Sequence, residues 1–314
     1  MILLPPLVQH DPVGCGPVET STPALVVPCG QANRSVATSA GIESVAMSSR
    51  RTTVVSWNVN GIRAAEKKGL LDWLQATRAD VVALQETKAH PDQLSLALRQ
   101  PAGYHTSWCA AERKGYSGVA TFSREQPLDI RLGLDDARFD SDGRVLISRF
   151  PGFVLLNIYF PNGGRGPEWV EYKLAFYARF VQVIAALMAA GQHVIVVGDV
   201  NTAYAEIDLA RPRENVRVSG FLPEERSAMG HFFTAGLIDT FRHMYPAVQK
   251  YSWWDQRTGA RARDIGWRLD YIFVSPGLRD AIVDAEIHCD VVGSDHCPVS
   301  VTLDLPLDQA GSFG

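Results

Sequence analysis

Short apolar runs alternate with helical stretches from residue 53 to the end of the chain. The runs are rich in β-branched residues and are bounded by glycine, proline, asparagine or aspartate, which is typical of strands in a packed sheet. Two runs are separated only by Phe150-Pro151-Gly152, a connection that joins antiparallel neighbours, so a purely parallel sheet is disfavoured. Strands are predicted at 53–57, 80–85, 119–123, 145–149, 153–159, 193–198, 269–274 and 299–303.

The clearest helix is predicted over 168–190. Apolar residues recur there at three- and four-residue steps, and Gly191 follows as a C-terminal cap. Weaker amphipathic helices are predicted at 61–77 and 224–235. After residue 50 the chain has no Pro/Gly-rich linker and no repeat, so 51–314 is interpreted as one mixed α/β domain. The predicted apolar stripe of the long helix consists of Val170, Leu174, Tyr177, Val181, Ile184 and Met188.

Residues 1–50 differ in kind from the rest of the chain. They hold six prolines, many serines and threonines and no aromatic residue, whereas all 29 aromatic residues lie after residue 56. Such a segment cannot bury enough apolar surface to offset the entropy of ordering it. We therefore expect a disordered leader. A second interpretation, that Met47 is the true start of the protein, stays equally open.

The composition excludes some classes of protein. Of the 314 residues, 46% are hydrophobic, which is ample for a folded core. The 30 Lys and Arg against 34 Asp and Glu give a formal net charge of −4, which argues against binding nucleic acid through bulk positive potential. Five scattered cysteines without a Cys-x-x-Cys spacing favour neither a disulfide framework nor a structural zinc site. A cytoplasmic location fits this cysteine usage, at the nucleoid if the protein is bacterial.

Neither a membrane span nor an export signal is expected. No stretch approaches the roughly 18 uninterrupted apolar residues of a membrane helix. The first residues, MILLPPLV, are apolar but lack a basic segment and are interrupted by Pro5 and Pro6. We expect a monomer that does not associate with membranes.

Polar side chains gather where the predicted strands end. Taken singly, most of them are explained as turn formers, since Asn and Asp are common after strands. Glu86 is harder to explain in this way, because a carboxylate beside a buried strand must be paired or bound to a metal. Six segments show the pattern: Asn58 to Gly61, Gln85 to Lys88, Phe160 to Gly163, Gly198 to Asn201, Asp270 with Tyr271, and Ser294 to His296.

Together these segments predict a site for a hard cation. If the strands belong to packed sheets, their ends converge on one edge. Carboxylate and amide oxygens suit Mg²⁺ or Mn²⁺, while zinc would need more His or Cys. The same loops carry hydrogen-bond donors and Arg165 within a glycine-rich turn, which suit a phosphodiester. The residue types therefore predict a metal-dependent phosphodiesterase. The convergent set is Glu86, Asp199, Asp270, Asp295, Asn60, Asn162, Asn201 and His296.

The order of motifs resembles the exonuclease III / apurinic-apyrimidinic endonuclease family of the DNase I-like superfamily. LQETK, GDVN and SDH occur across the superfamily, whereas DTFRHMYP and GWRLDY are specific to the abasic-site branch. The matching strings span nearly all of 53–304: SWNVNGIR (56–63), LQETK (84–88), GYSGVATFSR (115–124), NIYFPNGGRG (157–166), VVGDVNTAYAEIDL (196–209), GFLPEER (220–226), DTFRHMYP (239–246), GWRLDYIF (266–273) and GSDHCPV (293–299).

The resemblance implies a four-layer αββα sandwich of two mixed β-sheets, with the site at their shared edge. It implies hydrolysis of the phosphodiester 5′ to an abasic site in double-stranded DNA, repair of blocked 3′ ends, and 3′→5′ exonuclease activity. Glu86 is then the principal metal carboxylate, assisted by Asn60 and Asp295. The ion is Mg²⁺, with Mn²⁺ as a substitute. Asn60 stands where some members have Asp, which leaves the number of metal ions open.

The resemblance also implies the catalytic roles. Asp199 activates the attacking water and Asn201 orients it, while Asp270 accepts a hydrogen bond from His296 and so fixes the imidazole. Whether Tyr159 acts as a phenolate or His296 takes a proton stays open. The remaining donors to the phosphate or the leaving group are Tyr159, Asn58 and Asn162.

Substrate selection is implied by a second group of residues. Trp253, Trp267 and Leu269 match the family's apolar pocket for a base-free sugar flipped out of the duplex. A core position is the alternative for Trp253, and more so for its neighbour Trp254. Arg165 and Arg257 stand where members insert side chains into the duplex, although Arg257 replaces the Met of human-type members. A basic stretch for backbone phosphates is predicted at Arg257, Arg261, Arg263 and Arg268.

Two rival functions stay open. One is another branch of the superfamily, such as a sphingomyelinase, an inositol phosphatase or a general DNase. The other is a catalytically inactive member that binds nucleic acid as a regulator. The tryptophan pocket and the basic loop favour abasic DNA over the first, and the complete set of polar residues argues against the second.

Overall fold

The computed structural model describes residues 49–306. The predicted leader and the alternative start at Met47 therefore lie outside the described residues, except that Ser49 and Arg50 begin strand β1. Strand β1 thus includes two residues before the predicted boundary at residue 51.

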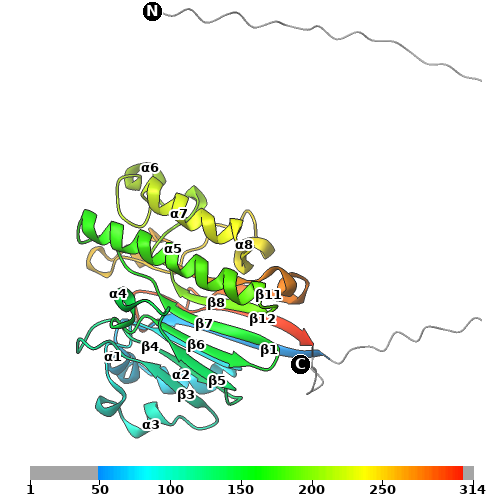
Figure 1. The fold of residues 1–314 in the computed structure, drawn as a ribbon. Coiled ribbons are helices and arrows are strands. Elements are labelled where there is room, and N and C mark those ends of the chain that lie inside the picture. Colours follow the sequence, from blue (N-terminus) through cyan, green and yellow to red (C-terminus); the bar gives the residue numbers. More distant parts are fainter. Residues whose placement is uncertain (1–48, 307–314) are drawn as a thin grey trace, which may run out of the picture. The chain divides into compact units, whose positions relative to one another are not determined.

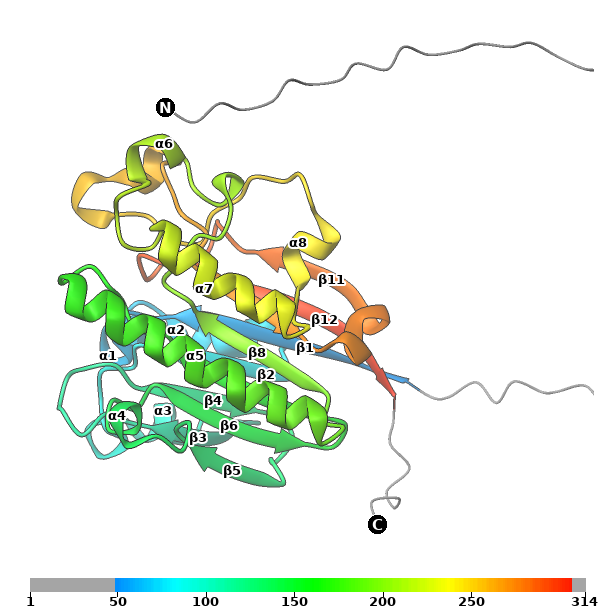
Figure 2. The same ribbon diagram turned by 45° about the horizontal axis from the view of Figure 1, so that its top comes forward.

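Two mixed sheets of six strands each lie face to face, with helices on their outer faces (Figures 1 and 2). The first sheet has the order β11 (Ile282–Ile287), β12 (Val299–Pro306), β1 (Ser49–Asn58), β2 (Val81–Gln85), β4 (Val119–Ser123) and β3 (His105–Cys109). The second has the order β5 (Asp129–Leu132), β6 (Val145–Phe150), β7 (Phe153–Tyr159), β8 (Val194–Asp199), β10 (Asp270–Val274) and β9 (Ile238–Asp239). This is the four-layer sandwich that the sequence predicted.

The helices divide between the two outer faces. Helices α1 (Ile62–Lys67), α2 (Leu70–Thr77) and α3 (Leu96–Arg99) pack on the first sheet. The second sheet is covered by α4 (Ala137–Asp140), α5 (Pro167–Ala189) and α7 (Pro223–Thr234). The short helices α6 (Pro212–Asn215) and α8 (Thr240–Met244) lie in the connections, as do five 3₁₀ turns at Pro91–Gln93, Glu206–Asp208, Gln256–Thr258, Ala260–Arg263 and Pro276–Ala281.

Each sheet contains one parallel pair at its centre, and these pairs place the site. In the first sheet β1 runs parallel to β2, and both end at the same edge, with Asn58 beside Gln85. In the second sheet β7 runs parallel to β8, with Tyr159 beside Asp199. Strand β10 is antiparallel to β8 and begins where β8 ends, so Asp270 lies opposite Asp199.

The predicted strands are present, and the structure adds four at or near the sheet edges: β3, β5, β9 and β11. The predicted helix at 61–77 was wrong as a single element. It breaks into α1 and α2 at Lys68 and Gly69, where Gly69 has a φ of +94°. Gly191 ends α5 as expected, because its amide donates to the carbonyl of Met188 while Gln192 donates to Leu187.

The buried face of α5 is rotated from the predicted stripe. Of the predicted positions only Tyr177 and Ile184 are fully buried. Apolar residues occur around most of this helix, so periodicity alone could not select the face, and two phenylalanines outside the predicted stripe pack against the second sheet. The buried set is Lys173, Phe176, Tyr177, Phe180 and Ile184.

By length and composition alone, α5 could cross a membrane. In the fold, however, its aromatic residues Phe176, Tyr177 and Phe180 are buried against the second sheet and α7. Phe180 lies 5.1 Å from Phe160 and 4.8 Å from Phe232 between ring centroids. This packing supports a core helix.

Gly198 marks the tightest approach between β7 and β8. Its φ is +145°, and a Cβ there would lie 1.8 Å from the carbonyl oxygen of Ile158. Gly198→Ala should therefore lower the free energy of unfolding by about 3 kcal/mol or more. The matched control is Gly191→Ala, whose φ is +76° with nothing within 4 Å, so only the backbone penalty of about 1 kcal/mol applies. Urea denaturation of both variants measures the difference, and equal losses would contradict this account.

Candidate active site

Two carboxylates from opposite sheets meet at the shared edge. Glu86 follows β2 and Asp199 ends β8, and the amide of Asn58, at the end of β1, donates to both. Its Nδ2 lies 2.9 Å from Glu86 Oε1 and 2.9 Å from Asp199 Oδ2. Asn58 is completely buried, so this bridge is shielded from water. One side chain thus fixes the spacing of two like charges.

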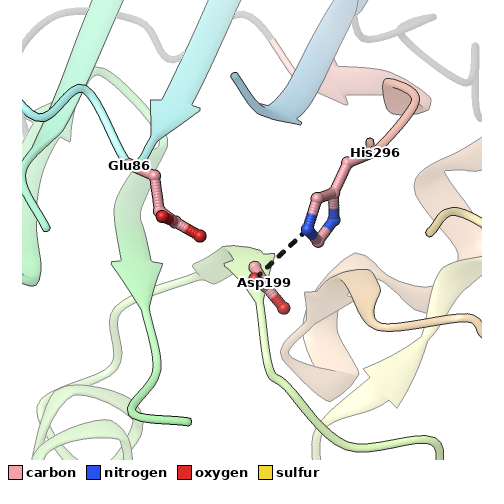
Figure 3. Close-up of side chains that lie close together, drawn as sticks. All are labelled: Glu86, Asp199 and His296. Atoms are coloured by element: carbon pink, nitrogen blue, oxygen red, sulfur yellow. Dashed lines mark ion pairs between the residues drawn. The ribbon is translucent and has the colours of Figure 1, made fainter. Parts of the chain in front are cut away.

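An imidazole completes the cluster (Figure 3). His296 Nε2 lies 3.8 Å from Asp199 Oδ2, and His296 Nδ1 lies 2.8 Å from Asp270 Oδ2. Asp270 is in turn fixed by its backbone amide, which donates to Ser252 Oγ at 3.0 Å. Its other carboxylate oxygen is buried and accepts no hydrogen bond from the described residues. The imidazole is therefore held between two acids, with Nε2 directed towards Asp199.

The burial of these groups changes their protonation. Burial raises the pKa of Asp199 to about 7, reinforced by Asp270 and Glu86 and opposed by His296. Burial lowers the pKa of His296, but Asp270 and Asp199 outweigh that effect and raise it to about 10. The imidazole is thus a cation at neutral pH in the metal-free protein, while Asp199 can gain or lose a proton there.

Glu86 stays ionised in the same surroundings. Burial would raise the pKa of Glu86, but Lys88 and the hydrogen bond from Asn58 outweigh it, so the pKa lies below its usual value. Burial, together with the charges of Glu86 and Asp199, raises the pKa of Tyr159 well above its usual value. The metal-free site therefore favours a neutral phenol at Tyr159.

A second amide pair lies beside Asp199. Asn201 donates from its backbone to Asp199 Oδ1 at 2.9 Å and from its side chain to Asp199 Oδ2 at 3.2 Å. Its side-chain oxygen accepts a hydrogen bond of 2.8 Å from Asn162 Nδ2. Asn162 follows β7 and Asn201 follows β8, so this hydrogen bond joins the loops after the two strands at the site.

The cation ligands predicted from the sequence lie together, linked by one lysine. Lys88 Nζ is 2.7 Å from Glu86 Oε2 and also donates to Asn60 Oδ1. Asn60 Nδ2 donates to Asp295 Oδ1 at 2.9 Å. The Asp295 pKa is lowered despite burial, because His296 and the donors Asn60 and Trp253 stabilise the carboxylate.

The residues present fit a divalent cation. Glu86, Asp199 and His296 each offer one ligand atom, and these atoms lie within 4.8 Å of one another. The Lys88 ammonium already contacts oxygens of Glu86 and Asn60, so this oxygen set attracts positive charge. Carboxylates suit a hard cation better than an imidazole does, so Glu86 and Asp199 are the ligands that the chemistry favours. The geometry thus adds Asp199 to the metal ligands that the family resemblance implied, while the role of Asp295 stays a prediction.

The predicted pocket residues form a small cluster beside the imidazole. Trp253 and Trp267 are partly buried and pack with Leu269. Trp253 Nε1 donates to Asp295 Oδ2 at 3.2 Å, and its ring centroid lies 6.5 Å from that of His296. Trp254, by contrast, is buried in the core between the sheets. The Trp253–Trp267 cluster therefore lies directly beside the catalytic cluster.

The basic stretch predicted for backbone phosphates was partly wrong. Arg268 is buried and forms ion pairs with Asp208 at 2.8 Å and with Asp239 at 2.7 Å. Arg261 donates to backbone carbonyls, including that of Val291, and stacks on Trp254. Both arginines hold the loop together instead of facing solvent.

Arg257 and Arg165 stay available to a ligand. The Arg257 side chain is 94% exposed, with an ion pair of 3.5 Å to Asp255. Arg165 stacks over the ring of Trp169 at 4.5 Å and lies 5.5 Å from the ring of Tyr116. Aromatic stacking holds the guanidinium of Arg165 without neutralising its charge.

Sequence reasoning missed a second basic region. A pocket beside the α1 N-terminus is lined by Arg63, Lys67 and Lys88 together with Gly61 and Gly115. Arg63 and Lys88 lie in the SWNVNGIR and LQETK strings, but the site was predicted only from the acidic and amide residues of these strings. The signal in the sequence was the presence of a cation in each of these loops.

The comparisons with known proteins agree with the fold. The sequence matches the Endonuclease/Exonuclease/phosphatase family over residues 55–296. The chain therefore belongs to this family.

Its relatives place it in the nuclease branch. An exodeoxyribonuclease of Bacillus subtilis is 42% identical over 254 residues, which cover 80% of this chain and 99% of that protein. The DNA repair nuclease APEX1 of Danio rerio is 37% identical over 253 residues, covering 80% and 81% respectively. The chain is a hydrolytic nuclease, and its resemblance to exonuclease III and the abasic-site endonucleases is confirmed.

Solved structures show the same fold. An AP endonuclease from Leishmania major has a TM-score of 0.74 and 29% identity, covering 82% of this chain and 89% of that one. A 3′–5′ exonuclease from Neisseria meningitidis has a TM-score of 0.75 and 28% identity, covering 81% and 100%. A related 3′ phosphatase from Neisseria was solved with a product DNA hairpin.

The paired His296 makes stability depend on pH. Its folded-state pKa of about 10 exceeds the unfolded value, so its ion pairs add stability that is present below about pH 6.5 and lost as the pH rises towards 10. We expect the metal-free protein to lose roughly 2–4 kcal/mol of unfolding free energy through this group between about pH 7 and pH 10. Asp270→Asn should make this loss clearly smaller.

Urea denaturation in a chelator, measured across this pH range, tests the expectation. Asp304→Asn is the matched control, because that carboxylate is 41% exposed and pairs only with Arg51 among the described residues. The same pH dependence in Asp270→Asn and wild type would contradict the pairing of His296 with Asp270.

Proposed function

We propose that the protein is a Mg²⁺-dependent DNA repair phosphodiesterase that cleaves the backbone 5′ to abasic sites. It also removes blocking groups from 3′ ends and acts as a 3′→5′ exonuclease. The observation that carries the proposal is the position of the Trp253–Trp267 pair beside the His296 imidazole, where the two indoles would form the walls of a substrate pocket. A base-free sugar flipped into this pocket would bring its 5′ phosphate to the catalytic cluster, whereas the indole walls would exclude a normal nucleotide by size.

Asp199 is the group that accepts a proton from the attacking water. In the metal-free protein, burial raises the pKa of Asp199 to about 7, so its carboxylate is more basic than an exposed one. Asn58 and Asn201 donate to its oxygens and so fix the direction in which the remaining lone pairs face. When bound, Mg²⁺ would be held by Glu86, with Asp199 and Asn60 nearby, and would supply charge stabilisation to the phosphate oxygens.

The other side chains receive the negative charge that develops on the phosphate. His296, kept protonated by Asp270, directs Nε2 towards the site as a cationic donor. Asn162 is oriented by Asn201, and its Oδ1 accepts from the amide of Gly164, so its position is fixed before substrate binds. The phenol of Tyr159 stays protonated and can donate to the leaving group. Such preorganised donors account for much of the rate of an enzyme.

The DNA backbone is held by local positive charge. Arg63, Lys67 and Lys88 line the pocket beside the α1 N-terminus, Arg165 stacks on Trp169, and the Arg257 side chain is exposed. Contacts of this kind position a duplex without reading its sequence, and salt weakens them.

We further propose a cytoplasmic monomer that does not bind membranes. The three cysteines in the described part of the chain, Cys109, Cys289 and Cys297, are free thiols, which suits a reducing compartment.

A gel assay with one preparation tests the substrate. We expect a duplex with a single tetrahydrofuran site to be cut at least about 10²-fold faster than the intact duplex, because only the base-free sugar fits the pocket. A 3′-phosphoglycolate end should also be trimmed. Asp199→Asn is the control for contaminating nucleases and should lower turnover by about 10³-fold or more without unfolding. Equal rates on abasic and intact duplex would favour a general DNase.

Metal removal tests the cofactor. EDTA should abolish cleavage, and either Mg²⁺ or Mn²⁺ should restore it, because the ligands are oxygens that suit hard cations. Restoration by Zn²⁺ alone would contradict the choice of ion. Full activity in EDTA, with retained metal excluded by elemental analysis, would reject the metal mechanism.

A further inference from the structure

A fully buried ion pair lies behind the catalytic loops. Lys173 on α5 and Glu225 on α7 are 2.8 Å apart, and both side chains are 0% exposed. A lysine is almost never buried completely unless it is paired. Neither residue belongs to the catalytic cluster, and the sequence did not mark Lys173 as part of the buried helix face.

The lysine also holds the backbone of a site residue. Lys173 Nζ donates to the carbonyl oxygen of Asn201 at 2.7 Å. Asn201 has a φ of +57°, a left-handed conformation that is unfavourable for most residues. This conformation lets the Asn201 side chain donate to Asp199 and to the carbonyl of Phe160 while accepting from Asn162.

The glutamate ties two further segments to the same point. Glu225 accepts hydrogen bonds from Ser219 Oγ at 2.8 Å, from the backbone of Leu222 at 3.2 Å and from that of Gly220. Gly163, next to Asn162, packs on this turn. A Cβ on Gly163 would lie 2.6 Å from Ser219 Oγ and 3.2 Å from Glu225 Oε1. The pair therefore connects the loops that carry Asn162 and Asn201.

Stability alone does not explain the pair. Apolar replacements of a buried ion pair are often neutral or stabilising, because both charges lose their hydration on folding. The two helices already pack through aromatic rings, with Tyr177 and Phe232 at 5.0 Å between centroids. What an apolar pair could not supply is a donor directed at the Asn201 carbonyl.

We propose that Lys173 and Glu225 are positioning residues that act on catalysis through Asn201 and Asn162. Lys173 holds Asn201 in its left-handed conformation, and Glu225 holds Lys173 and the turn against which Gly163 packs. The inference rests on the phosphodiesterase proposed above. It predicts that turnover depends on a charged pair that touches neither substrate nor metal.

Three variants separate positioning from stability: Lys173→Met, Glu225→Gln and the double variant. Each single change leaves a buried group without its partner and should lower the Tm by about 10 °C. The double variant removes both charges and should recover most of that loss. Its kcat on the abasic duplex should nevertheless stay about 10- to 100-fold below wild type, with KM within about twofold, because Asn201 has lost its donor.

A second cycle tests whether the effect passes through Asn201. In Asn201→Ala, the further change Lys173→Met should lower kcat much less than it does in wild type, because the side chain being positioned is already gone. If the two changes instead lowered kcat by independent factors that multiply in the double variant, the proposal would be overturned. Arg179→Gln is the matched control on the same helix, since Arg179 donates to the carbonyl of Leu134, away from the site. It should lower the Tm while leaving kcat unchanged.

Hydrogen exchange gives a readout independent of activity. The segment 199–204 should lose protection in the double variant, while β7 and β10 keep theirs. A wild type inactive on abasic DNA would overturn the proposed function, yet exchange would still decide the positioning role. A double variant with wild-type kcat, or with unchanged exchange in 199–204, would overturn the inference.

Discussion

The site between the two sheets depends on the hydrogen bonds of one side-chain amide, that of Asn58. Glu86 and Asp199 carry like charges, and each ends a strand of a different sheet. Left alone, two close carboxylates repel each other, and one of them takes up a proton. Asn58 prevents their separation by donating one hydrogen to each, at 2.9 Å in both cases. Because it is an amide, it supplies two donors without adding a charge, which leaves the net negative potential that attracts a cation.

The loops that follow the strands store strain at the same place. Asn60, Glu86 and Asn201 all have positive φ, although none is glycine. Such conformations are unfavourable by roughly 1–2 kcal/mol each and persist only where surrounding contacts enforce them. Those contacts are visible: the Asn58 side chain accepts from the backbone of Asn60, and Lys173 holds the carbonyl of Asn201. The turns direct the side chains into the space between the sheets, so the site is rigid before substrate or metal binds.

Sequence reasoning succeeded where burial and local chemistry act together. The central strands are mostly apolar and buried, and β4 and β7 were located to the residue. The edge strand β5 is exposed along its length and carries charged residues, so it gives no such signal. Long-range pairing was equally invisible: Arg268 looked like a ligand for phosphate, yet Asp208 and Asp239, 60 and 29 residues away, bury it. The polar strand ends could be predicted because the topology of parallel strands forces them to one edge.

The formal net charge also predicted the ligand poorly, because it does not show which charges are paired inside the fold. A sum over the chain gives each residue equal weight, but a buried charge paired inside the fold contributes little to the surface potential. Asp208, Asp239 and Glu225 are internal partners of Arg268 and Lys173, and Asp199 and Asp270 face the imidazole. The acidic excess of the composition therefore lies partly inside the protein, where it organises the site. The cations that line the pocket beside α1 stay accessible, so a chain with a formal charge of −4 can still present a positive surface to a phosphate backbone.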